Sequence, residues 1–313
     1  MTWTNDFRLY AIEVKVVGMS SPLYISGLTD GSIEANSEIL RETVAGTLFA
    51  PTASLQTVKP VANFTSLNLP QALDAFGLGG AASCITSDGT HPGVNFYFAK
   101  QACAGAAAGA VHRKYTVSQG IVVPTRLNVT HRGNATIAYA IHTSYDGTNN
   151  PVILTENVAL PAANLAGDPG GRWTMDAMVI GAVAIEGKRD ISIDFQANIQ
   201  SEGADSNAFD TSVSLRSILQ NVKVSGVDPS WFTSVSPLLG VGVSDLNTTW
   251  IYKKRNVELT VAEHVKLIAN GLVTWDQIVG GNPDAPATAS FNINCTLGSS
   301  GNNPIGFDSA YGT

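Results

Sequence analysis

Residues 121–160 read IVVPTRLNVTHRGNATIAYAIHTSYDGTNNPVILTENVAL, and this stretch decides the fold class. Three runs within it, 121–129, 135–145 and 152–160, alternate apolar and polar residues with the period of two that is typical of half-buried strands. The segments between them, HRGN and DGTNNP, consist of residues that favour turns. We therefore expect an antiparallel meander of three strands here.

The same alternation extends outward along most of the chain. A hairpin is expected to join 178–185 to 191–199 through the turn sequence EGKRD. A short helix is expected at 70–77, with proline in its first turn and glycine at its end, and one helical turn at 228–232. Further strands are expected at 7–17, 94–99, 213–227, 238–252 and 287–297. The fold class that follows is all-β, mainly antiparallel, a sandwich or barrel-forming subunit with a few short helices.

The domain organisation follows from a shift in composition. Residues 162–171 are rich in Ala, Gly and Pro, and they separate a β-rich lobe at 1–161 from the segment 172–297. That second segment is either another β-rich lobe or a continuation of the same sandwich. Residues 298–313 are Gly-, Asn- and Ser-rich, and we expect them to form a flexible C-terminal tail.

Composition excludes several classes of protein. Of the 313 residues 44% are hydrophobic, but only 14% are charged, against about 25% in ordinary soluble domains. This excludes a coiled coil and a charge-rich disordered chain. The formal net charge of −7 argues against a protein that grips nucleic-acid phosphates over its whole surface. Low charge also indicates that other molecules cover much of the surface.

Targeting signals and cysteine usage indicate where the protein folds. The first ten residues lack a basic segment followed by an apolar run, and no stretch reaches the roughly 18 apolar residues of a membrane span. Three cysteines without metal-ligand spacing predict reduced thiols rather than a disulfide framework. We expect assembly in a cytoplasm.

The sequence contains no motif that predicts catalysis. There is no phosphate-binding loop, zinc pair, EF-hand or nucleophile elbow, and the five histidines are scattered without ligand spacing. Carboxylates four residues apart, such as Glu34 and Glu38, occur on solvated faces as readily as in catalytic pairs. We therefore expect no catalytic residues, no cofactor, no metal site and no enzymatic activity.

Self-assembly explains the low charge without invoking chemistry. Exposed strand edges invite pairing, and a ring of identical subunits that continues one sheet into the next removes those edges. A sheet-rich chain with few charges is physically suited to such burial against copies of itself.

Several segments resemble virion proteins of tailed bacteriophages. The strand at 9–17 followed by LTDGSIEANSE at 28–38 resembles the opening of major tail tube proteins. The segments VVPTRL at 122–127, GNA at 133–135, DGTNNP at 146–151 and ALP at 159–161 are similar to phage virion proteins too. The resemblance covers about the first half of the chain and the segment 263–273, and it consists of strand and turn patterns.

This resemblance implies a tail tube subunit of the virion, assembled in the host cytoplasm. The subunits would form rings of six chains, or of three chains with pseudo-six-fold symmetry, stacked into a tube that contacts other tail proteins and no membrane. DNA would pass through the lumen without specific binding, because an acidic or neutral wall lets it slide. The expected lumen-facing residues are drawn from Glu13, Glu34, Glu38 and Asp194.

Two other function classes remain open. Another virion component, such as a capsid, decoration or distal-tail protein, would share this composition. A carbohydrate-binding or carbohydrate-active sandwich would need a groove with exposed aromatic side chains and convergent carboxylates. The tryptophans that could serve such a groove are dispersed along the chain, at Trp173, Trp231, Trp250 and Trp275.

Overall fold

The computed structural model is an all-β protein built from antiparallel sheets, which confirms the predicted fold class. It describes the chain except for residues 1–5, 16–20, 44, 46–47, 51, 79–83, 87–92, 104, 162–170, 182, 205–206, 229–242, 281–286 and 298–302. Within the described ranges there is one helix, α1 (Leu69–Phe76), at the place that the sequence predicts. Most of the helical turn expected at 228–232 lies outside them.

The strands are numbered along the chain. They are β1 (Phe7–Lys15), β2 (Leu23–Ile25), β3 (Leu28–Glu34), β4 (Ser37–Glu42), β5 (Thr52–Val58), β6 (Val61–Ser66), β7 (Cys84–Ile85), β8 (Gly93–Ala102), β9 (Gly105–Ala106), β10 (His112–Val117), β11 (Gly120–Thr130), β12 (Thr136–Thr143), β13 (Val152–Val158), β14 (Trp173–Ile180), β15 (Val183–Ala184), β16 (Asp190–Gly203), β17 (Asp210–Val227), β18 (Val243–Lys254), β19 (His264–Gly280), β20 (Thr288–Cys295) and β21 (Ile305–Tyr311).

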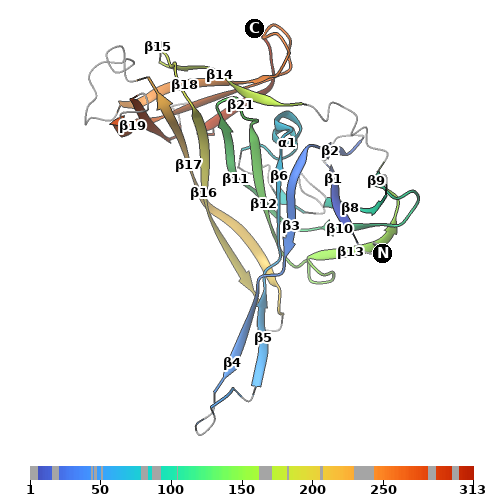
Figure 1. Cartoon of the computed structure of the whole chain (residues 1–313). Coiled ribbons are helices and arrows are strands. Elements are labelled where there is room, and N and C mark those ends of the chain that lie inside the picture. Colours follow the sequence, from blue (N-terminus) through green and yellow to red (C-terminus); the bar gives the residue numbers. More distant parts are fainter. Residues whose placement is uncertain are drawn as a thin grey trace.

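These strands form three sheets (Figure 1). The small sheet has the order β13-β10-β8-β1-β2, with β9 paired to β8. The large sheet has the order β15-β14-β18-β19-β20-β17-β16-β11-β12-β6-β3, with β21 on β19 and β7 on β11. The third sheet is the hairpin β4–β5. The large sheet takes strands from both sides of the linker expected at 162–171.

The small and large sheets pack face to face over one apolar core. Phe96 of the small sheet meets Phe64 of the large sheet edge-on, with ring centroids 6.1 Å apart. Helix α1 closes one end, where Phe76 packs against Tyr139 at 5.5 Å and the Tyr139 hydroxyl donates to the carbonyl of Gly77 at 2.7 Å. Aromatic pairs of this kind add to the stability that area burial provides.

The large sheet also curls back on itself. The backbone amide of Ala135 donates to the carbonyl of Trp173 at 2.7 Å, which brings β14 against the connection between β11 and β12. Trp250 and Tyr252 of β18 are buried inside this curl. Residues before and after the segment 162–171 therefore share one apolar core.

The expected meander is correct for its first two strands and wrong for its third. β11 pairs with β12, but β13 pairs with β10 in the small sheet. The free side of β12 is occupied by β6 instead. Asp146 turns the chain after β12, because its carboxylate accepts the backbone amides of Thr148 and Asn149 at 2.8 and 2.6 Å. These bonds also lower the pKa of Asp146.

The expected hairpin between 178–185 and 191–199 is wrong as well. β14 pairs with β18, whereas β16 pairs with β11 and β17. A turn composition indicates where a strand ends, but the partner of that strand depends on which edge elsewhere in the sheet is free.

The prediction of a flexible tail at 298–313 is wrong for Ile305–Tyr311. These residues form β21, which pairs with β19 and lies against α1. Ile305 is buried, the Ser309 hydroxyl donates to the Asp74 carboxylate at 2.6 Å, and the Lys266 ammonium lies 4.7 Å from the centre of the Tyr311 ring. Removal of this segment should therefore destabilise the fold.

Candidate functional site: a polar sheet face and a projecting arm

One face of the large sheet carries two rows of mostly polar residues, which follow from its pairing register. Leu127, Ile193 and Val222 pair across β11, β16 and β17 and are fully buried. Successive residues of a strand point to opposite sides of a sheet, so the neighbours of these three residues point away from the core. They belong to two rows, here called the polar wall: Thr65, Ala138, Arg126, Asp194, Asn221 and Asn294, and Thr136, Asn128, Ser192, Lys223, Asn292 and Thr274.

The two cations of the polar wall are each paired with a carboxylate. Arg126 Nε lies 3.7 Å from Asp194 Oδ1, and Lys223 Nζ lies 2.6 Å from Asp276 Oδ2. The hydrogen bond from Lys223, followed by its charge, lowers the pKa of Asp276. These side chains are about half exposed, so the pairs contribute little to stability. The charges within these two pairs cancel, and the other residues of the two rows are Ala138 and residues with amide or hydroxyl side chains.

The structure brings two of the four predicted lumen-facing residues onto this side of the sheet. Asp194 belongs to the polar wall itself. Glu34 lies on the edge strand β3, where it is exposed and its partner across the strands is Val61. Ser32, two residues earlier on the same face, donates its hydroxyl to Glu34 at 3.2 Å. Three strands, β6, β12 and β11, separate Glu34 from Asp194.

Glu13 and Glu38 lie elsewhere. Glu38 is exposed on β4 and accepts a hydrogen bond from the Thr57 hydroxyl at 3.1 Å. Glu13 is only 8% exposed, inside the small sheet. Its carboxylate accepts hydrogen bonds from the Asn95 amide at 2.8 Å and from the hydroxyls of Tyr24 and Tyr97 at 3.2 Å. Glu13 is therefore a structural carboxylate that no exposed surface contains.

The buried carboxylate affects the two phenols that donate to it. Burial, and after it the charge of Glu13, raises the pKa of Tyr97 to about 12. The pKa of Tyr24 is raised for the same reasons in the same order. The group couples β1, β2 and β8, and it extends to β10 through the Thr116 hydroxyl, which donates to Asn95 at 2.7 Å.

Replacing Glu13 should reveal this role. We expect Glu13→Leu to lower the free energy of unfolding by about 1–3 kcal/mol or more, because buried donors lose their acceptor. Glu13→Gln, the matched control, keeps one acceptor oxygen and should cost less. In a spectrophotometric titration the pKa of Tyr97 should fall in Glu13→Leu yet stay above 10, since burial remains. Unchanged urea denaturation and unchanged tyrosine titration would contradict this assignment.

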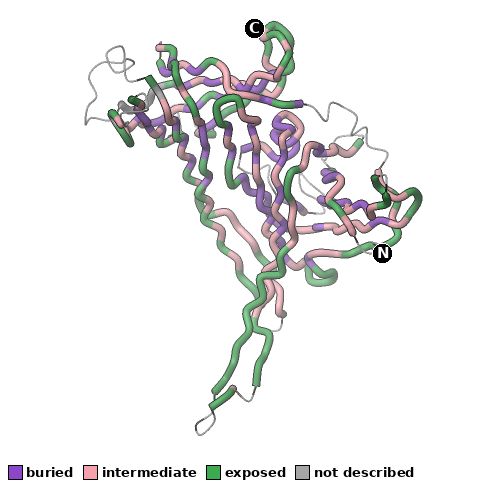
Figure 2. The backbone as a smooth tube through the Cα atoms, in the orientation of Figure 1, coloured by how far each residue is buried: buried purple, intermediate pink, exposed green. Residues whose placement is uncertain are grey.

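The hairpin β4–β5 projects from the body as an arm (Figure 1). Every residue of β4 is exposed, and Figure 2 shows that most of the arm is exposed. Ile39 and Leu55 face one another across the two strands and are 56% and 54% exposed. Leu48 and Phe49 at the tip are 95% and 84% exposed. An isolated two-stranded hairpin is marginally stable in water, and its exposed apolar side chains favour contact with another protein.

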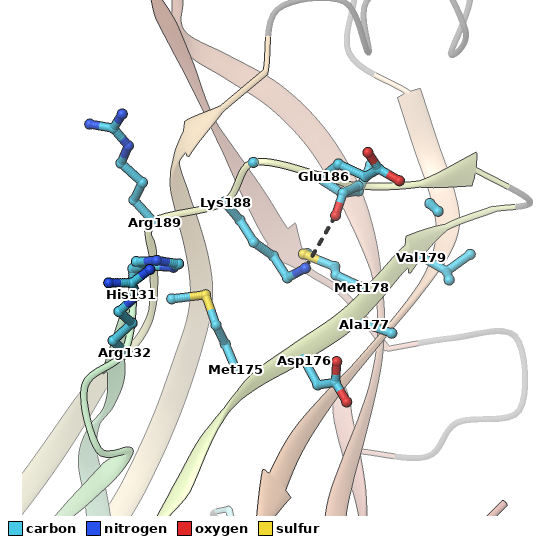
Figure 3. Close-up of a pocket in the computed structure, with 13 residues that line it drawn as sticks. His131, Arg132, Met175, Asp176, Ala177, Met178, Val179, Glu186, Lys188 and Arg189 are labelled. Atoms are coloured by element: carbon cyan, nitrogen blue, oxygen red, sulfur yellow. Dashed lines mark hydrogen bonds between the residues drawn. The ribbon is translucent and has the colours of Figure 1, made fainter. Parts of the chain in front are cut away.

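A pocket of about 910 Å³ lies beside β14 and the connection 186–189 (Figure 3). Lys188 points into it and donates to the carbonyl of Ile185 at 3.2 Å. Burial lowers the pKa of Lys188, and the nearby charges of Asp176 and Glu186 oppose that effect. The residues that line the pocket include no hydroxyl or thiol side chain.

Other candidate chemistries find no site in the described residues. No group of three or more His, Cys, Asp or Glu side chains there could hold a metal ion. The described helix is too short to cross a membrane, and no other described segment is a helix. Of the four tryptophans considered as stacking platforms for a sugar, Trp173 and Trp250 are buried, Trp275 is partly exposed, and Trp231 lies outside the described residues. Cys84 and Cys103 are exposed free thiols, and burial raises the pKa of Cys295 to about 12.

No protein-family model and no curated protein matches the sequence. The functional argument therefore rests on the geometry of the polar wall and of the arm. A signal for the wall is present in the sequence, since Ser192, Asp194 and Gln196 alternate with apolar residues. The arm carries no comparable signal, because polar and apolar residues do not alternate in SEILRE, the sequence of β4.

Proposed function

We propose that this chain is a structural virion protein, a major tail tube subunit that assembles into stacked rings around a conduit for DNA. The observation that supports the proposal is the polar wall, a neutral surface in which both cations are already paired. The subunits act in the virion tail after assembly in the host cytoplasm.

The proposed mechanism is passive. Duplex DNA carries one negative charge per about 1.7 Å, and a surface with free Lys and Arg would hold it by releasing counterions. On the polar wall, phosphates meet amides, hydroxyls and cations whose charge Asp194 and Asp276 already balance. The formal net charge of −7 adds weak repulsion. Such a wall lets DNA slide without binding specific bases.

Assembly is the role of the exposed arm and of the sheet edges. The arm offers apolar surface that a single copy leaves in water, and outer strands such as β3 and β13 have a free edge within the described sheets. Neighbouring copies can cover both. Either six chains, or three chains with pseudo-six-fold symmetry, would close the ring, and other tail proteins would meet its ends.

Negative-stain electron microscopy of the purified full chain tests this proposal. We expect stacked annuli with a central channel at high protein concentration. Shells or isolated small rings would favour the alternative class of virion component, namely a capsid, decoration or distal-tail protein. A monodisperse single-copy species at all concentrations would contradict self-assembly in either form. For the carbohydrate alternative, the burial of Trp173 and Trp250 is an argument against.

A further inference from the structure

An apolar groove lies at the root of the arm. It consists of two adjacent cavities of about 290 and 260 Å³ that share Ile33 and Val152, and we call it the root groove. The first cavity is lined mainly by Phe7, Ile33, Phe98, Tyr115 and Val152. The second is lined mainly by Ile33, Val58, Pro60, Pro151, Val152 and Phe209. Its size and lining suit large apolar side chains.

The walls of the root groove are held in place by their own contacts. Phe98 and Tyr115 meet edge-on with ring centroids 5.4 Å apart. The Arg113 guanidinium lies 4.3 Å from the centre of the Phe7 ring, and it pairs with Glu156 at 2.9 Å. A groove held in this way is available to a ligand without rearrangement.

The floor on the arm side is fixed as well. The Val58 amide donates to the carbonyl of Ala208 at 2.7 Å, which ties β5 to the end of the β16–β17 hairpin. Phe209 lies 5.9 Å from Tyr145, and Asp210 pairs with Lys59 at 3.6 Å. The arm therefore has an anchored root next to a preformed groove.

The tip of the arm carries side chains that match such a groove but cannot reach the root groove of the same copy. Leu48 and Phe49 are the two most exposed large apolar residues of the described chain. The arm is extended and points away from the body (Figure 1). The nine residues that lead from Val58 of the root groove back to Phe49 span up to roughly 30 Å at ~3.3 Å per residue. An occupant supplied by the tip must come from a second copy.

We propose that Leu48 and Phe49 of one copy occupy the root groove of the next copy. Donor and acceptor are different surfaces of the same chain, so the contact is heterologous and repeats without closing on itself when the copies are stacked. It would join successive rings along the tube, with a spacing of the order of the arm length. This inference deepens the proposed function and rests on it for the direction of stacking.

Cross-linking with single cysteines tests the contact. Starting from a full chain with Cys84→Ser, Cys103→Ser and Cys295→Ala, which removes all three native cysteines, one preparation carries Phe49→Cys and another carries Val152→Cys. A short bismaleimide is added to each preparation alone and to their mixture, after circular dichroism has confirmed that both variants are folded. We expect covalent dimers in the mixture only. A chain that carries both cysteines should form a ladder of covalent oligomers.

A matched control and the possible outcomes separate this inference from the proposed function. Leu219→Cys, exposed on β17 outside the groove, should not cross-link to Phe49→Cys. Dimers from Phe49→Cys alone would indicate a tip-to-tip contact and overturn the inference. Tubes without the mixed dimer would assign the groove to another occupant, and so would overturn the inference while the proposed function stands. Mixed dimers without tubes would support the contact and contradict the tube.

Discussion

A chain without its arm should fold but fail to form tubes. Ser37 pairs with Val58 at the base of the hairpin, so residues 38–57 can be replaced by Asn-Gly, the dipeptide that closes a two-residue hairpin turn. All residues of β4 are exposed, and the removed segment therefore contributes little to the core. We expect the far-ultraviolet circular dichroism and the melting temperature to stay close to those of the full chain. Electron micrographs should show monomers or single rings.

The reason for the large effect is that every copy in a stack uses the same arm. A contact that repeats around a ring acts many times at once, and its loss removes the cooperativity of stacking. Val279→Ser, which removes an exposed apolar side chain from β19 outside the arm and the root groove, is the matched control and should leave tube length unchanged. Tubes of ordinary length from the armless chain would show that the arm has no part in assembly.

The strands could be predicted from the sequence because alternation is a local signal. β12 and α1 lie where the pattern places them, and the start of β1 does too. The partners of the strands could not be predicted in this way. β13 leaves β12 for the small sheet, and Ile305–Tyr311 pairs with β19, because both choices depend on edges that distant segments leave free. In β21 the polar composition of the tail conceals one well-buried residue, Ile305.

In the candidate site, too, the alternation along a strand could be predicted from the sequence and the contacts between strands could not. The alternation that places Asp194 and Ile193 on opposite faces of the sheet is visible in the sequence. Which of the two faces meets the core depends on the whole sheet. In β1 the four consecutive residues 11–14 are buried, so both faces of this strand are covered and Glu13 has no outward side to occupy. The self-pairing of charge between Lys223 and Asp276 joins residues 53 positions apart. It becomes visible only once the register is known.

Removing the two carboxylates that pair with the cations of the polar wall should turn a surface that DNA slides along into one that holds it. The double variant Asp194→Asn, Asp276→Asn removes the partners of Arg126 and Lys223 and makes the net charge of each chain less negative by two. Both ion pairs are about half exposed, so folding should be nearly unaffected. Assembled protein should then retain duplex DNA in a sedimentation assay at low salt, whereas the unmodified protein should not.

The salt dependence of that retention identifies its cause. If the freed cations contact phosphates, the logarithm of the binding constant should fall linearly with the logarithm of salt concentration, with a slope of about −0.9 for each phosphate contact. Adding Arg126→Gln and Lys223→Gln to the double variant should abolish retention, because the two cations are then gone. Retention that survives these changes must come from another surface. No retention by the double variant would mean that the polar wall does not face the DNA, since free cations on a lumen wall, repeated around every ring, could not leave a polyanion unbound.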